Sequence, residues 1–235
     1  MRLVKLSVFR RGLTSLTNAF LSIRWVMNKI SESFQYNPQV FRVVPGDIEV
    51  ELRQHNTVLT GQRIVLRPLT ENDWDILFRW NNDPEVLYFV EGDEVSSRTM
   101  DEVQAIYRTV SQTAFCFMIE YDKEPIGECW LQQANLDFIL QKYPDADSRR
   151  IDLMIGKKEL WGRGIGTEIV RLLTVFAFEH EQADWVWGCD IADYNRASQK
   201  VFQKAGYQLS ETIPQPAGSK ARTCLNFVVS RETFI

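Results

Sequence analysis

The chain has 235 residues, of which 45% are hydrophobic and 12% aromatic, and its formal net charge at pH 7 is −4. This composition is typical of a globular protein and excludes an intrinsically disordered one. The negative charge argues against general attraction to nucleic acid, so we expect no nucleic-acid partner. The mildly apolar N-terminal stretch is interrupted by Asn18 and Arg24 and is too polar to span a bilayer.

The few cysteines and histidines argue against a metal site and against thiol catalysis. No two cysteines have Cys-x-x-Cys spacing, so no metal is expected. Neither histidine lies near a candidate nucleophile, which disfavours a Cys/His catalytic pair. We expect reduced thiols and a cytoplasmic protein. The residues concerned are Cys116, Cys129, Cys189, Cys224, His55 and His180.

The N-terminal segment differs in charge from the rest. Residues 1–31 hold six basic residues and no acidic one, so removing +6 from −4 leaves −10 for the remainder. Such asymmetry predicts a separate segment. We predict an extension or linker over residues 1–60 and one domain over residues 61–235. An appendage, a membrane-surface helix, a transit-like leader and an upstream start remain open as explanations of the extension.

From Gly61 onward the patterns predict alternating strands and helices. Alternation of apolar and polar residues predicts strands, and apolar residues at three- and four-residue spacing predict helices. In chain order we expect a strand at 63–70, a helix at 70–83 that ends at Asp83-Pro84, a helix at 98–110, and two strands within 114–133 around a turn at Asp122–Pro125.

The second half predicts a polar loop, a strand, a glycine-rich turn, a helix, a strand, a helix and a final strand. The loop lies at 142–150, the strand at 151–156, the turn at 161–166, and the helix at about 167–180. The next strand lies at 185–191, the last helix at 195–206 and the final strand at 224–234. Gly206 suits the C-terminal cap of its helix. The order predicts a single α/β (α+β) domain with a twisted, mixed β-sheet flanked by helices.

The glycine-rich turn reads W-G-R-G-I-G and leads directly into an apolar helix. Glycine permits positive φ and close approach of the backbone to a ligand. Free backbone N–H groups at a helix N-terminus favour phosphate, and Arg163 adds a positive charge. The turn matches neither the Walker loop nor G-x-G-x-x-G. A plain tight turn before a helix remains the alternative.

The turn and the later segment N-R-A-S-Q-K-V-F-Q-K-A-G-Y resemble the signature of the acetyl-CoA-dependent N-acetyltransferase (GNAT) superfamily. That signature is Gln/Arg-x-x-Gly-x-Gly/Ala after a strand, followed by Asn-x-x-Ala/Ser-x-x-x-Tyr/Phe-x-Lys-x-Gly-Phe/Tyr. Trp161 stands where the family has Gln or Arg. The resemblance implies the GNAT fold and acetyl-CoA as co-substrate. It assigns the pyrophosphate to amides of Arg163, Gly164, Ile165, Gly166 and Thr167, and the pantetheine arm to the main chain of Met154 and Ile155 and to Asn195.

Segments over most of residues 64–208 further resemble the aminoglycoside 6'-N-acetyltransferases, including "LRPLTENDWDILFRWNND", "KEPIGE" and "RRIDLMIGKKELWGRGIGTEIVR". The resemblance implies acetyl transfer to the 6'-amine of a polycationic aminoglycoside, and hence antibiotic resistance. It places the candidate base on Asp152 and a second ammonium-binding carboxylate on Asp190. Phe89, Val90 and Glu91 fall in the substrate pocket, with Val90 in place of a family tryptophan.

The chemistry of amine acetylation is consistent with these acids. An alkyl ammonium has a pKa of about 10.4, so a carboxylate that attracts it and accepts its proton assists attack on the thioester. We expect direct transfer in a ternary complex, and therefore that alkylation of the thiols leaves turnover largely intact. A simple ion pair of Asp152 with Arg149 or Arg150 is the alternative. Further acids expected at the mouth of an acidic cleft are Glu91, Asp93, Glu94, Asp145, Asp147 and Asp193, with a solvated loop as the alternative for Asp145 and Asp147.

One departure concerns the general acid of the resembled family, a tyrosine that falls on Phe202. Phenylalanine cannot donate a proton, but a thiol with a pKa of about 8.5 leaves without much help, so we interpret Phe202 as a packing residue. Acylation of a siderophore hydroxylamine and acetylation of a protein N-terminus remain alternative activities. A non-catalytic acetyl-CoA-binding module is an alternative of another class. The protein is expected to be a monomer or a homodimer.

Overall fold

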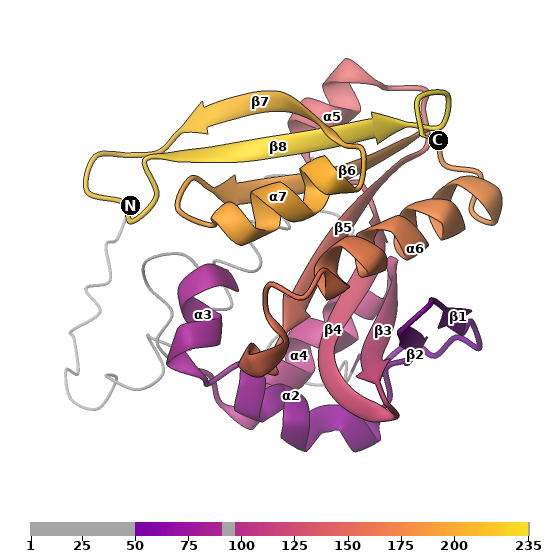
Figure 1. Cartoon of the computed structure of the whole chain (residues 1–235), viewed down its shortest axis with the longest axis vertical. Coiled ribbons are helices and arrows are strands. Elements are labelled where there is room, and N and C mark those ends of the chain that lie inside the picture. The colour runs from indigo at the N-terminus through magenta and orange to yellow at the C-terminus, as the bar shows by residue number, and fades with distance from the viewer. Residues whose placement is uncertain (1–49, 91–96, 235) are drawn as a thin grey trace, which may run out of the picture.

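A computed structural model describes residues 50–90 and 97–234. One eight-stranded sheet runs through the molecule in the order β1-β2-β3-β4-β5-β6-β8-β7 (Figure 1). Its neighbours pair antiparallel except for β5 and β6, which are parallel, so the sheet is mixed as predicted. The strands are β1 (Leu59–Thr60), β2 (Ile64–Pro68), β3 (Ala114–Tyr121), β4 (Glu124–Gln133), β5 (Ser148–Ile155), β6 (Trp185–Ala192), β7 (Gln208–Pro214) and β8 (Thr223–Ser230).

Helices cover both faces of the sheet (Figure 1). The longest, α6, packs with α7 on one face, while α2 and α4 lie on the other. The helices are α2 (Trp74–Trp80), α3 (Pro84–Val90), α4 (Met100–Ser111), α5 (Asp137–Lys142), α6 (Ile165–Glu179) and α7 (Arg196–Lys204), with short 3-10 turns at η1 (Glu71–Asp73) and η2 (Lys158–Leu160). None of these described helices is long and apolar enough to cross a membrane.

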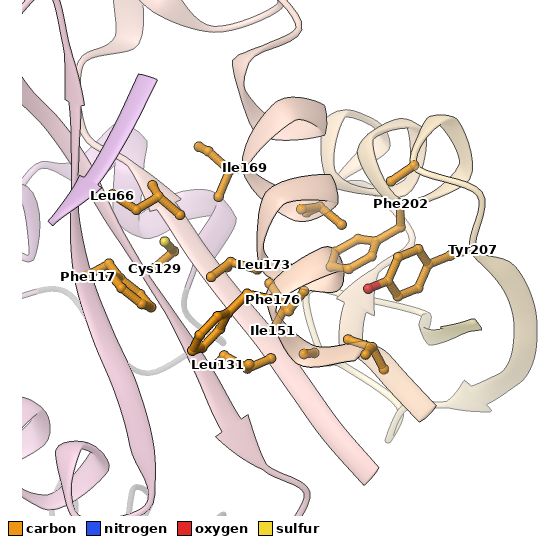
Figure 2. Packing of buried hydrophobic residues seen from close by; sticks show 14 of the residues in the cluster. Leu66, Phe117, Cys129, Leu131, Ile151, Ile169, Leu173, Phe176, Phe202 and Tyr207 are labelled. Carbon is orange, nitrogen blue, oxygen red and sulfur yellow. The ribbon is translucent and has the colours of Figure 1, made fainter. Parts of the chain in front are cut away.

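The main core lies between the sheet and the pair α6 and α7. Figure 2 shows Leu66, Phe117 and Leu131 of the sheet gathered with Leu173 and Phe176 of α6. Burial of a large apolar side chain stabilises a fold by about 1.5–3 kcal/mol, so the apolar face of α6 anchors the helix and the turn before it. A second cluster on the opposite face includes Trp74, Tyr107, Met118 and Met154.

Local signals in the sequence explain several element boundaries. Thr99 caps α4, because its hydroxyl accepts from the Glu102 N–H at 3.2 Å. The Glu102 carboxylate in turn accepts from the Thr99 N–H at 2.8 Å. Asn195 caps α7 by accepting from the Ser198 N–H at 3.0 Å. Such caps satisfy backbone donors that the first helical turn leaves free.

Besides the short elements β1 and η2, the sequence did not predict α3, α5 and β7. Pro84 does end the preceding helix, but it also begins α3, since proline suits the first position of a helix. Helix α5 lies just before the expected loop at 142–150, in a segment for which no element was predicted, and Phe138 packs edge-on against Trp187 at 5.7 Å between centroids. Strand β7 pairs with β8 at the edge of the sheet.

The described end of the predicted linker packs on the domain. Leu52 is buried, and the Arg53 guanidinium donates to the carbonyls of Ser111 at 2.6 Å and Ala114 at 3.0 Å. The short strand β1 then adds to β2. The basic segment 1–31 lies outside the described residues.

Strands β5 and β6 separate along their length. Their parallel pairing covers only Ser148–Arg150 and Trp185–Trp187. Beyond it, the pairing of β6 with β8 is irregular between Gly188 and Ile191, and Asp190 has φ of 55°, which is rare for a non-glycine residue. The sheet therefore opens into a V between β5 and β6, and this V contains the candidate site.

Candidate active site

A cavity of about 440 Å³ lies between the separated strands. This volume falls within the range of small-molecule sites. Side chains alternate along β5, so Ile151 faces α6 while Asp152 and Met154 face α2 and α4. Because the cavity passes between the strands, groups from both faces of the sheet line it. They include Phe89, Val90, Arg150, Ile151, Asp152, Cys189, Asp190, Tyr194, Asn195, Ser198, Phe202, Lys220 and Cys224.

The glycine-rich turn contains two glycines with positive φ, the backbone conformation expected if it is a phosphate-binding turn. Gly162 has φ of 74° and Gly164, the N-cap of α6, has φ of 82°, conformations that favour glycine. A Cβ on Gly166 would lie 3.0 Å from the Val201 side chain, so this glycine lets α6 approach α7. The Arg63 guanidinium donates to the Arg163 carbonyl at 2.9 Å, which holds the turn in place.

The Ile155 main chain and the Asn195 side chain, both assigned to the coenzyme by resemblance, hydrogen-bond to other residues of the protein. The Ile155 carbonyl accepts from the Trp161 indole N–H at 2.7 Å, and the Asn195 amide donates to the Phe89 carbonyl at 3.2 Å. The rings of Phe89 and Trp161 also meet edge-to-face, with centroids 5.6 Å apart. The end of α3 thus lies between the glycine-rich turn and the start of α7, a placement visible in Figure 1.

Asp152 lies in the cavity wall and accepts three hydrogen bonds. The Arg150 guanidinium donates through Nε to Oδ2 at 2.9 Å and through its terminal nitrogen to Oδ1 at 3.0 Å. The Trp130 indole donates to Oδ2 at 3.0 Å. A carboxylate has about four acceptor positions, so one remains for a ligand. The ion pair weighed as an alternative for Asp152 is therefore present, with Arg150 as the partner, and it fixes the carboxylate in the cavity.

Arg150 also lies near the second predicted acid. Burial acts to lower the pKa of Arg150, but the charges of Asp152 and Asp190 outweigh it and the pKa is raised. The guanidinium therefore stays charged between these acids. The bulge in β6 places Asp190 in the cavity wall, where its backbone N–H donates to the Asn226 side chain at 2.9 Å.

A buried acid behind Asp152 was not predicted. Glu128 of β4 is 4% exposed and shares a sheet face with Trp130, the cross-strand neighbour of Asp152. Tyr107 hydrogen-bonds to it, and no described residue donates to its Oε2. Burial, and then the charge of Asp152, raise the pKa of Glu128 well above its usual range. The signal available in the sequence was an acid within the otherwise apolar segment I-G-E-C-W-L.

Phe202 is a packing residue that also borders the cavity. It is 3% exposed, lies 5.1 Å from the Tyr207 ring between centroids, and fills the space opposite Gly188, where a Cβ would come within 2.3 Å of it. The sequence interpretation of Phe202 is confirmed. Two thiols, Cys189 and Cys224, line the cavity, so a bulky alkylating reagent on either would occupy part of this space.

The structure brings five of the predicted site residues into one cavity, and the cleft is not simply acidic. These five are Phe89, Val90, Asp152, Asp190 and Asn195. The residues assigned to the coenzyme by resemblance at Met154, Ile155 and 163–167 do not line the cavity, and Glu91 lies outside the described residues. Among described residues the only lining acids are Asp152 and Asp190, and Arg150 and Lys220 balance them. The remaining acids expected at the mouth that are described, Asp145, Asp147 and Asp193, do not line it.

No metal-binding cluster is found within residues 50–90 and 97–234. Nowhere there do three or more His, Cys, Asp or Glu side chains gather as metal ligands. The cavity wall carries the carboxylates, cations and thiols described above, together with the hydroxyl of Tyr194.

A mixed sheet with a glycine-rich turn and a carboxylate in its opening is consistent with the acetyltransferase fold that the sequence resemblance implied, and comparison with known proteins agrees. The sequence profile described as Acetyltransferase (GNAT) domain matches residues 63–208, more than half of the chain. The chain belongs to this family and is an acetyltransferase.

Relatives of known activity are distant. The chain is 24% identical over 164 residues to "Aminoglycoside N(6')-acetyltransferase type 1" of Klebsiella pneumoniae, covering 68% of this chain and 81% of the relative. The structure of AAC(6')-Ib in complex with ribostamycin and coenzyme A superposes with a TM-score of 0.62 at 22% identity, over 73% of this chain and 96% of that one. Mycobacterium smegmatis RimJ in complex with CoA-disulfide gives a TM-score of 0.59 at 16% identity, over 75% and 88%. The two structural matches establish the shared fold.

Proposed function

We propose that the protein transfers the acetyl group of acetyl-CoA to the 6'-amine of an aminoglycoside, by direct attack in a ternary complex. The observation that carries the proposal is the single cavity that joins Asp152 and Asp190 to Asn195 and Phe202 across the opened sheet. A coenzyme on the α7 side and an amine held by carboxylates would meet there. The relative from Klebsiella pneumoniae supports the choice of acceptor.

Binding of acetyl-CoA would use the side of the cleft next to α6 and α7. Amides of Arg163–Thr167 would hold the pyrophosphate at the positive end of α6. The edge of β5 beyond Arg150 no longer pairs with β6, so Met154 and Ile155 would pair with the pantetheine as an added strand would. Asn195 would contact the same arm, after release of the Phe89 carbonyl. The cytoplasm, where acetyl-CoA is made, would be the place of action.

Asp152 would orient the acceptor and take its proton. An alkyl ammonium with a pKa of about 10.4 is only rarely neutral at pH 7, so attack requires proton removal. The remaining acceptor position of Asp152 would receive an N–H of the substrate, and the proton would pass to the carboxylate directly or through water as the C–N bond forms. Arg150 and Trp130 would hold the carboxylate in one geometry. The thiolate would then leave without a proton from Phe202.

A second candidate acceptor is favoured by the cations of the cavity wall. Arg150 and Lys220 suit an acceptor that carries an anionic group beside its amine, as a siderophore hydroxylamine built on an amino acid does. The proposed aminoglycoside has no such group.

An assay of thiol release from acetyl-CoA separates the candidates. Kanamycin, tobramycin and gentamicin are offered in turn with N6-hydroxylysine and a peptide amine, and mass spectrometry locates the acetyl group. Release with the aminoglycosides and a 6'-N-acetyl product is the expected result. Release with N6-hydroxylysine alone would change the assigned acceptor and leave the proposed chemistry unchanged. If none of the acceptors caused thiol release, the proposal would be overturned.

A further inference from the structure

Two tyrosines and a lysine meet at the mouth of the cavity. The ring centroids of Tyr88 and Tyr194 are 5.2 Å apart. The Lys220 ammonium lies 3.8 Å from the centroid of Tyr88 and 4.8 Å from that of Tyr194, and it donates to the Tyr88 carbonyl. We call the two rings with this carbonyl the tyrosine box. Its occupant is a primary alkyl ammonium.

The tyrosine box adjoins the candidate acceptor site. Lys220 and Tyr194 line the same cavity as Asp152, and Tyr88 is next to the lining residue Phe89. The two tyrosines and Lys220 come from separate parts of the chain: α3, the connection between β6 and α7, and the turn between β7 and β8. The Tyr194 hydroxyl donates to the Tyr88 carbonyl at 3.3 Å, which ties two sides of the box together.

The chemistry of the box suits an ammonium group from any source. Aromatic faces attract cations within about 6 Å of the ring centroid, and a carbonyl oxygen accepts an ammonium hydrogen. We propose that the tyrosine box is a binding site for an ammonium group of the acceptor, and that Lys220 occupies it as an internal competitor in the free protein. This inference rests on the proposed function in taking a polyamine as the acceptor.

Competition by Lys220 explains how a cleft whose cations balance its acids could still bind a polycationic acceptor. With Lys220 in place, its charge and that of Arg150 balance Asp152 and Asp190, which disfavours a polycation. An acceptor ammonium that replaces Lys220 in the box lets this cation move out into solvent. Lys220 follows Gly218, which has φ of 94°, in the turn between β7 and β8. Tyr88 is 49% exposed, so the box is accessible from outside.

The test measures dissociation constants by calorimetry on the full chain with saturating coenzyme A. The probes are kanamycin and 1,5-diaminopentane, a simple diammonium that needs no turnover. Removal of the competitor in Lys220→Met should tighten both about tenfold, which corresponds to Lys220 filling the box in about nine of ten molecules. Adding Tyr88→Leu, which keeps the carbonyl and removes the ring, should then weaken binding about fivefold. Lys204→Met, which removes an exposed lysine of α7, is the matched control and should change neither.

The outcomes separate this proposal from the acceptor assignment. Tighter binding of 1,5-diaminopentane by Lys220→Met, without acetylation of kanamycin by any variant, would support the tyrosine box as an ammonium site and contradict the aminoglycoside as the acceptor. Acetylation of kanamycin with unchanged dissociation constants in Lys220→Met would overturn the box alone. Weaker binding in Lys220→Met would also overturn it, because Lys220 would then support the acceptor site. Matching thermal unfolding of the variants excludes a folding defect as the cause.

Discussion

The two sides of the cleft are built in different ways. On the coenzyme side, the glycine-rich turn and the caps of α6 and α7 are short, continuous segments whose geometry follows from their own residues. On the acceptor side, Asp152, Glu128, Tyr88 and Lys220 come from four separate parts of the chain and come together only when it folds. In the proposed function, the first side binds the coenzyme that acetyltransferases share, and the second side binds the acceptor.

The family match covers residues 63–208 and establishes the chemistry of acetyl transfer. The acceptor depends on side chains that no local motif specifies, and the relatives of known substrate are only 24% identical. Substitutions on the acceptor side should therefore lower turnover, whereas substitutions on the coenzyme side should lower coenzyme affinity.

The largest effect is expected for Asp152→Asn on the acceptor side. An amide cannot accept the proton and no longer attracts the ammonium, so kcat/KM should fall about 10²- to 10⁴-fold while coenzyme affinity stays unchanged. Thiol release and coenzyme titration measure the two quantities. Asp147→Asn is the control, since Asp147 also pairs with an arginine, Arg149 at 2.6 Å, but lies outside the cavity. More than a tenth of the activity left in Asp152→Asn would show that this carboxylate is not the base.

The coenzyme side is tested by Gly164→Val. A β-branched residue at φ of 82° is strained and adds bulk where the phosphates are expected, so the dissociation constant of coenzyme A should rise at least about tenfold. Gly206→Val, at φ of 98° in the C-terminal cap of α7, carries the same strain away from the turn. Both variants should lose about 1–3 kcal/mol of stability, and only the first should lose coenzyme. Equal coenzyme affinity in the two would exclude the turn as the phosphate seat.

Glu128→Gln tests the buried acid behind the acceptor side. Burial raises the pKa of Glu128 in the folded state, so above its usual value of about 4.3 the folded protein binds a proton that the unfolded chain has lost. This contribution to stability is full below that pH and is lost as the pH rises toward the folded-state pKa. The variant should match the wild type near pH 4 and become more stable by about 1.4 kcal/mol for each pH unit above it, until Glu128 ionises in the folded protein.

Urea unfolding at pH 4 to 8 measures the difference in free energy between Glu128→Gln and the wild type. Glu124→Gln, at a carboxylate of the same strand whose side chain is 70% exposed, is the control for loss of one carboxylate. A difference for Glu128→Gln that does not change with pH would mean that Glu128 is ionised in the folded protein.

The smallest effect is expected where the two sides meet. Replacement of both Cys189 and Cys224 by alanine should change kcat by no more than about twofold, because direct transfer needs no thiol nucleophile. Their place in the cavity wall means that the thiol-free variant should also become resistant to inhibition by bulky alkylating reagents. Loss of turnover in the alanine variant, with coenzyme affinity intact, would favour an acyl-enzyme.

The sequence predicted the elements on the proposed coenzyme side because their signals are local. The turn, the helix after it and the end of α7 at Gly206 each depend on residues within a few positions of one another. The two strands around the polar turn were predicted for the same reason, and in the structure Asp122 and Lys123 adopt positive φ there.

The acceptor side was predicted only in part because its contacts are distant in sequence. Resemblance placed Asp152 and Asp190, and the structure brings both into one cavity, but the expected acidic mouth was wrong for the described residues. Pro84 was interpreted only as a helix end, which hid α3 and with it the tyrosine box. Lys220 sits in a turn that carries no signal of its partners, 132 residues from Tyr88.

A crystal structure of the protein with coenzyme A would test the proposed coenzyme site most directly. We predict that the pyrophosphate lies on the amides of Arg163–Thr167 and the pantetheine between β5 and β6. We also predict that the Asn195 amide turns from the Phe89 carbonyl to the coenzyme, with the thiol directed at Asp152. Coenzyme bound anywhere else, or a pantetheine arm that leaves the Asn195–Phe89 bond intact and the thiol remote from Asp152, would contradict the proposed site.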